Sequence, residues 1–93
     1  FEWDSDKAQS NFQKHGIRFD EAKTIFSDPL LLTYPDDFHS DEEERFLSIG
    51  YSSRNRLLLT VHTERLETET SIIIRIISCR KATNKEREFY EEE

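Results

Sequence analysis

Apolar positions follow a helical spacing over the first third of the chain and a strand-like spacing over the rest. A short strand is predicted at residues 1–3, after which Asp4 can cap the N-terminus of a helix. Gly16 ends that helix, because glycine accepts the left-handed backbone found just past a helix C-terminus. A second helix is predicted from about Phe19 to Phe26, where apolar residues share one face, and the dipeptide Asp28-Pro29 ends it.

The later segments are rich in aliphatic, β-branched and aromatic residues, which predicts strands at residues 30–34, 45–52, 56–64 and 71–80. Alternate residues of the third strand face opposite sides of the sheet, with Leu57, Leu59 and Val61 on one side and Leu58, Thr60 and His62 on the other. Thr83 and Glu86 have the spacing of a capping box, which predicts a C-terminal helix through about Tyr90.

The predicted order of elements is β-α-α-β-β-β-β-α, with neither a repeat nor a linker. This order predicts an α+β fold in which two N-terminal helices and a C-terminal helix pack on a twisted, mainly antiparallel sheet. The 93 residues, 34% of them hydrophobic, suffice for one core and not for two. A single compact domain is therefore expected over residues 1–93.

Cysteine content and hydropathy predict a protein of the cytoplasm. The single cysteine, Cys79, cannot form an internal disulfide, and it lies in an apolar run where a small buried side chain is expected. Apolar stretches all fall short of the roughly 20 residues that span a bilayer, and the N-terminus lacks the pattern of a secretion signal. A cytoplasmic location without membrane contact is therefore expected.

The net charge of −7 argues at first against a nucleic-acid partner. The acidic residues are concentrated, however, in segment 36–44 and in the tail 91–93, and the remainder of the chain is close to neutral. Basic residues crowd a late stretch that contains Arg75, Arg80, Lys81, Lys85 and Arg87. A basic site can therefore coexist with an acidic whole. Direct DNA binding is not expected, because the chain has no basic recognition helix.

Taken together, certain residues and their spacing resemble the BrnT family of toxins: Trp3-Asp4, Lys7, Asn11, Lys14-His15-Gly16, Phe19, Ala22, Arg45, Ile49-Gly50, Ser52, Arg75-Ile76-Ile77-Ser78, Arg80, Ala82, Glu86 and Tyr90. The resemblance covers essentially the whole chain. It implies a RelE-like fold, metal-independent RNA cleavage that inhibits translation, and a hetero-oligomer with a neutralising BrnA-type antitoxin that itself binds operator DNA. Two positions depart from the family pattern: Cys79 stands where alanine is expected, and Asn55 where glycine is frequent.

RNA cleavage without a metal needs a base for the 2′-hydroxyl proton, a cation for the charge on the phosphate, and an acid for the leaving oxygen. His15 is the obvious acid or base, because histidine titrates close to neutral pH. With it, the predicted catalytic residues are Lys14, Arg75 and Arg80. Each also has a structural interpretation: His15 can simply stabilise a helix C-terminus. Arg75 lies among isoleucines, so it must either pair with a carboxylate or line a cleft, and a cleft is the favoured interpretation.

The predicted substrate-binding residues are Lys7, Asn11, Arg45 and Lys81. Lys7, Asn11 and Lys14 form one polar stripe on the first helix, which could equally be a solvated face. Arg45 could pair with Glu43 or Glu44 at the surface. Glu86 is interpreted as a capping residue and Tyr90 as part of the core or its rim.

The rival histidines are His62, on a strand, and His39, in the acidic loop. His39 with Asp36, Asp37 and Asp41 could imitate a metal site, but a second histidine or cysteine at a suitable spacing is lacking. Neither a metal nor a cofactor is therefore expected.

The competing hypothesis is a non-catalytic module whose acidic loop and tail bind a basic partner. A catalytic role requires Lys7, His15, Arg75 and Arg80 to converge on one concave site. If segment 36–44 faces away from that site, an antitoxin can bind on the acidic side and block access sterically, or it can cover the basic site with carboxylates. The first arrangement is favoured.

Overall fold

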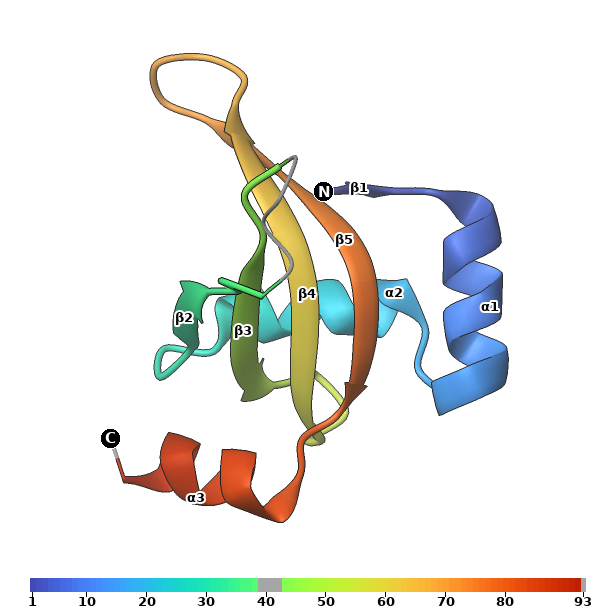
Figure 1. Cartoon of the computed structure of the whole chain (residues 1–93), viewed down its shortest axis with the longest axis vertical. Helices are drawn as coiled ribbons and strands as arrows, with labels where there is room; N and C mark the ends of the chain where they lie inside the picture. The colour runs from blue at the N-terminus through green and yellow to red at the C-terminus, as the bar shows by residue number, and fades with distance from the viewer. Residues whose placement is uncertain (39–42, 93) are drawn as a thin grey trace.

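A five-stranded mixed sheet organises the part of the chain that the computed structural model describes, residues 1–38 and 43–92 (Figure 1). The strand order is β1-β5-β4-β3-β2. The elements in chain order are β1 (Glu2–Trp3), α1 (Ser5–His15), α2 (Phe19–Ala22), the 3-10 helix η1 (Lys23–Ser27), β2 (Leu32–Pro35), β3 (Phe46–Tyr51), β4 (Leu57–Leu66), β5 (Ile72–Lys81) and α3 (Asn84–Glu91).

The first strand makes the sheet mixed. β1 pairs with β5 in parallel, with Glu2 opposite Arg75 and Trp3 opposite Ile76, whereas the pairings among β2, β3, β4 and β5 are antiparallel. The prediction of a mainly antiparallel sheet did not include this parallel pair. A strand of two residues carries no pattern that reveals its direction, so the pairing could not be predicted from the sequence.

Helix ends follow the predicted capping chemistry. The Asp4 carboxylate accepts hydrogen bonds from the backbone N–H groups of Asp6 and Lys7, and Gly16 ends α1 with φ of 71°. Thr83 and Glu86 form both bonds of the predicted capping box at the start of α3. The second predicted helix is α2 followed by the tighter η1. None of the described helices is long and apolar enough to cross a membrane.

The two faces of the sheet are covered unequally. One face, which includes Leu58 and Ile76, lies under α1, α2 and η1 and buries a core with Phe19 and Ile25. The opposite face carries Leu57, Leu59 and Ile49, and Tyr90 of α3 packs against it. This arrangement confirms the alternation predicted for β4. Figure 1 shows α3 at one end of the sheet, so among the described helices it covers only part of the second face.

The two departures from the family pattern have physical explanations. Asn55 has φ of 60° in the turn between β3 and β4, a left-handed conformation that asparagine tolerates better than most residues. Cys79 is 1% exposed, and its sulfur accepts a hydrogen bond from the Thr60 hydroxyl at 3.2 Å. Burial raises the pKa of the Cys79 thiol to about 11. Cys79 therefore acts as the small buried side chain that the sequence predicted.

Candidate functional site

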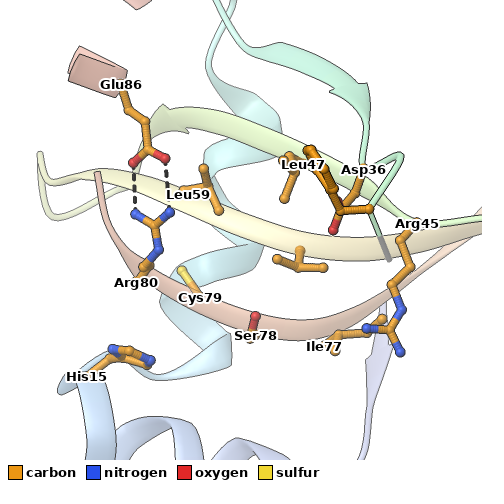
Figure 2. A pocket seen from close by; sticks show the side chains of 12 residues that line it. His15, Asp36, Arg45, Leu47, Leu59, Ile77, Ser78, Cys79, Arg80 and Glu86 are labelled. Carbon is orange, nitrogen blue, oxygen red and sulfur yellow. Dashed lines mark hydrogen bonds and ion pairs between the residues drawn. The ribbon is translucent and has the colours of Figure 1, made fainter. Parts of the chain in front are cut away.

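A cleft of about 550 Å³ lies on the second face of the sheet. Its floor is apolar and comes from β3, β4 and β5, while its rim is polar or charged. Figure 2 shows Arg80 and Arg45 at opposite ends of this cleft, with Ser78 between them. The lining residues are His15, Asp36, Phe38, Arg45, Leu47, Leu59, Val61, Ile77, Ser78, Cys79, Arg80 and Glu86.

A smaller hollow of about 320 Å³ lies between α1 and β5. It is lined by Lys7 and Lys14, together with Asp6, Ser10 and Asn11. It shares His15, Ile77 and Ser78 with the larger cleft, so the two hollows are adjacent. His15, half-buried at the last turn of α1, stands where they meet.

Arg80 is held by Glu86 at one end of the cleft. Its two terminal nitrogens donate to the two carboxylate oxygens at 2.8 and 2.9 Å, and Nη1 also donates to the backbone carbonyl of Lys81 at 3.2 Å. The paired guanidinium lowers the pKa of Glu86, and the carboxylate in turn raises the pKa of Arg80. Both side chains therefore stay charged across the physiological range. Glu86 was predicted only as a capping residue, and in the structure it both caps α3 and holds Arg80.

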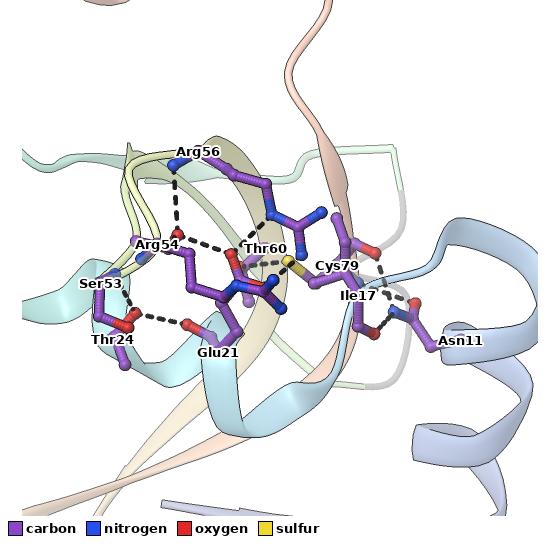
Figure 3. A network of polar contacts seen from close by, with 10 residues as sticks. Asn11, Ile17, Glu21, Thr24, Ser53, Arg54, Arg56, Thr60 and Cys79 are labelled. Carbon is purple, nitrogen blue, oxygen red and sulfur yellow. Dashed lines mark hydrogen bonds and ion pairs between the residues drawn. The ribbon is translucent and has the colours of Figure 1, made fainter.

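Asn11 lies in a buried hydrogen-bond network between α1 and the edge of β5 (Figure 3). Its amide nitrogen donates to the backbone carbonyls of Ile17 and Cys79 at 3.1 and 2.9 Å. Its amide oxygen accepts from the backbone N–H of Cys79 at 3.0 Å. Both amide hydrogens are used within the fold, so only the second lone pair of the amide oxygen is left for a contact with substrate. These bonds give Asn11 a structural role, and its contact with substrate stays a prediction.

Arg75 lines neither hollow. It donates to Glu2 at 2.9 Å, and Arg65 donates to both oxygens of the same carboxylate. The two arginines lower the pKa of Glu2 to about 2. Of the two positions that the sequence allowed for Arg75, the pair with a carboxylate is therefore observed, and the favoured cleft position is not seen in either hollow. The predicted short strand at residues 1–3 supplies the carboxylate through its parallel pairing with β5, which the sequence did not indicate.

The remaining predicted residues divide between the depression and the outside. Arg45 lines the cleft, with Nε 3.7 Å from a carboxylate oxygen of Glu43. Lys81 is exposed and lines neither hollow. The structure thus gathers His15, Arg45 and Arg80 in the cleft, places Lys7, Asn11 and Lys14 beside it, and leaves Arg75 and Lys81 outside.

His62 is a core histidine on the helix-covered face. Its Nε2 lies 2.7 Å from the Ser48 hydroxyl, and its ring contacts those of Phe26 and Phe46. Burial lowers the pKa of His62 to about 4, so the ring is neutral at physiological pH. His62 therefore cannot compete with His15 for a role in the cleft.

The acidic segment contributes to the cleft rather than facing wholly away from it. Asp36 is 7% exposed and lines the cleft together with Phe38. The sequence concealed this position, because Asp36 begins an acidic run that looks uniformly solvated. His39, Asp41 and Glu42 lie outside the described residues. Within residues 1–38 and 43–92 no group of three histidine, cysteine or acidic side chains could hold a metal ion.

Comparison with known proteins adds a family and a fold. A family model described as "Ribonuclease toxin, BrnT, of type II toxin-antitoxin system" matches residues 3–86. The structure is similar to the crystal structure of the Brucella abortus ribonuclease toxin BrnT, with 22% sequence identity and a TM-score of 0.64 over 90% of this chain and 96% of that one. At this identity the likeness shows the fold alone. Curated protein sequences gave no significant match.

Proposed function

Because the chain belongs to the BrnT family of ribonuclease toxins of type II toxin–antitoxin systems, we propose that residues 1–93 form one toxin domain that cleaves RNA without a metal ion in the cleft between His15 and Arg80. The observation that carries this proposal is that His15 and Arg80 line one concave site, with Arg45 at its opposite end. Of the other two residues that were expected to converge there, Lys7 lines the adjoining hollow and Arg75 lies outside both. Arg75 has no part in the proposal, because that side chain pairs with Glu2 outside the cleft.

The reaction uses the 2′-hydroxyl of the RNA as its nucleophile. The 2′-oxygen loses its proton and attacks the adjacent phosphorus, the bond from phosphorus to the 5′-oxygen breaks, and the leaving oxygen takes up a proton. The products are a 2′,3′-cyclic phosphate and a 5′-hydroxyl. His15 exchanges one of these protons as acid or base. Arg80 stabilises the negative charge that builds on the phosphate oxygens.

The hydrogen bonds of Arg80 suit this task. A guanidinium has five N–H donors, of which Glu86 and the Lys81 carbonyl take three on Nη1 and Nη2. The Nε donor and the second Nη2 donor have no partner among the described residues, and they lie side by side. This pair fits two oxygens of one phosphate. Glu86 is thus a positioning residue that holds Arg80 while leaving one edge of the guanidinium for RNA.

The smaller hollow extends the proposed RNA path. Lys7 and Lys14 are exposed on its wall and supply positive charge beside His15. Phosphates that flank the cleaved bond can bind there electrostatically. The negative total charge does not oppose this role, since these cations line a hollow that is adjacent to the cleft.

The family also supports the finer expectations about partners. We propose a RelE-like toxin fold, inhibition of translation, and neutralisation in the cytoplasm by a BrnA-type antitoxin that itself binds DNA and forms a hetero-oligomer with this chain. The family description supports an antitoxin partner of some kind.

The test is incubation of the purified chain with RNA in excess chelator, followed by identification of the product ends. We expect cleavage that yields 2′,3′-cyclic phosphate or its opened form and 5′-hydroxyl ends. His15→Ala and Arg80→Ala should reduce it strongly. Lys85→Ala, an exposed cation of α3 that lines neither hollow, is the matched control. Loss of cleavage in chelator with recovery in magnesium would contradict the metal-free mechanism.

A further inference from the structure

A third hollow lies beyond the C-terminal end of α1, between α2 and the turn that joins β3 to β4. It encloses about 270 Å³ and is lined by Phe12, Arg18, Asp20, Glu21, Arg54 and Arg56, among others. Figure 3 shows Glu21 of α2 near Arg54 and Arg56 of the turn. We refer to this hollow as the arginine groove.

Charge is unevenly compensated in the arginine groove. Arg56 is neutralised, because it donates from Nε and Nη2 to the carboxylate of Glu21, which is 6% exposed and also accepts from the Ser52 hydroxyl. The Asp20 carboxylate lies 4.0 Å from the Lys23 ammonium group.

Arg18 and Arg54 remain, and neither makes an ion pair within residues 1–38 and 43–92. Both are exposed. The hollow is thus lined by three arginines and two carboxylates, a net positive lining in a chain of net charge −7, which favours an anionic ligand.

An aromatic ring stands beside these cations. The Phe12 side chain is 41% exposed, and the guanidinium carbon of Arg18 lies 4.4 Å from the centre of its ring. A ring and a guanidinium in this arrangement offer flat surfaces on which a nucleobase can stack. Arg54, on the opposite wall, can contact a phosphate. Aromatic stacking combined with a cationic groove is how proteins bind single-stranded nucleic acid with little sequence preference.

The arginine groove is next to the candidate cleft along the chain. His15 stands at the junction of the two larger hollows, and the following residue, Gly16, lines the arginine groove. The last turn of α1 therefore separates the cleft from the arginine groove. An RNA strand that leaves the cleft past His15 can pass around the C-terminal end of α1 and reach Arg18 and Arg54.

We propose that the arginine groove is a subsite for a flanking nucleotide of single-stranded RNA whose cleaved bond lies in the cleft. The base stacks on the surface formed by Phe12 and Arg18, and a phosphate contacts Arg54. This inference rests on the proposed ribonuclease function. Phe12, Arg18 and Arg54 are proposed to bind the flanking part of longer RNA substrates and to take no part in the cleavage reaction. An acidic antitoxin segment would use the charges but not the flat surface that Phe12 and Arg18 form together, so RNA is the better match.

The probes for the test are fluorescein-labelled 2′-O-methyl oligonucleotides of increasing length, which cannot be cleaved through the 2′-oxygen. We expect wild-type affinity to rise once the probe is long enough to span the cleft and the arginine groove. Arg18→Ala/Arg54→Ala should lose this gain, by about tenfold, while binding the shortest probes normally. For each phosphate that the variant no longer binds, the slope of log affinity against log salt should fall by about 0.7. Phe12→Ala should weaken the long probes by at least about fivefold.

The matched control is Lys85→Ala/Arg87→Ala, which removes the same charge from exposed positions on α3. This control should retain the length-dependent gain. Thermal unfolding checks that each variant is folded.

Retention of the gain by Arg18→Ala/Arg54→Ala, in a protein that binds and cleaves RNA, would overturn the subsite proposal alone. Weakened antitoxin binding with unchanged RNA binding in that variant would also overturn it, in favour of a protein partner. A wild-type chain that neither binds nor cleaves RNA would refute the proposed function itself.

Discussion

The Asn11 network predicts a large loss of stability from one substitution on the first helix. Asn11→Ala removes three hydrogen bonds and leaves the N–H and carbonyl of Cys79 and the carbonyl of Ile17 without these partners in a buried place. A hydrogen bond of this kind contributes about 1 kcal/mol net, or about 3 kcal/mol for three. Alanine recovers roughly 0.6 kcal/mol through its higher helix propensity. The expected loss of unfolding free energy is therefore about 2–3 kcal/mol.

Urea unfolding at equilibrium measures this loss, with the fluorescence of Trp3 as the signal. In thermal unfolding the same loss corresponds to a fall in Tm of roughly 10–20 °C for a chain of this size. Gln9→Ala is the matched control, since it removes an exposed amide from the same helix. A loss below about 0.5 kcal/mol for Asn11→Ala, together with weakened RNA binding, would refute the structural role and restore the sequence-based prediction that Asn11 binds substrate.

Three further outcomes are expected. Desolvation lowers the pKa of the buried His62 to about 4, so between about pH 6.5 and pH 4 only the unfolded chain takes up a proton on this residue. The free energy of unfolding should therefore fall by roughly 3 kcal/mol as the pH falls through this range. In His62→Leu the free energy of unfolding, measured with urea, should depend less on pH over the same range, and an unchanged pH dependence would contradict the lowered pKa of His62. Glu86→Gln keeps an acceptor for the capping box but loses the charge that holds Arg80, so kcat should fall by about tenfold or more with intact folding. Full activity in this variant would show that Arg80 does not need the Glu86 carboxylate to hold its position. Antitoxin affinity should fall when Glu43 and Glu44 are replaced by glutamine and change little in Arg80→Ala. Calorimetry that gave the opposite order would place the antitoxin on Arg80 rather than on the acidic segment.

The sequence was sufficient for the elements whose signals are local. The Asp4 cap, the Gly16 stop and the Thr83 capping box each depend on residues within one helical turn, and all were predicted. The alternation in β4 is also local, because neighbouring side chains must point to opposite faces. The sequence therefore sufficed to predict which side chains of β4 share each face.

The failures of prediction concern contacts between distant segments. Arg75 was expected in a cleft because its isoleucine neighbours are visible in the sequence, whereas its partner Glu2 lies 73 positions away on a short strand whose pairing with β5 the sequence does not indicate. Asn11 was grouped with two lysines by helical spacing, but its amide pairs with β5 at a separation of 68. In both cases the polar side chain has a partner that only the folded chain supplies.

The most direct test of the cleft compares two arginines of the same strand. Arg80 lies in the cleft with a donor edge left for phosphate, whereas Arg75 is paired with Glu2 outside it. Single-turnover RNA cleavage is measured for wild type, Arg80→Ala and Arg75→Ala, each first checked for folding. Arg80→Ala should be slower by at least about tenfold, since loss of a group that stabilises transition-state charge costs roughly 3–4 kcal/mol elsewhere. Arg75→Ala should cleave at close to the wild-type rate, and an equal loss in both variants, or a loss in Arg75→Ala alone, would contradict the proposed cleft.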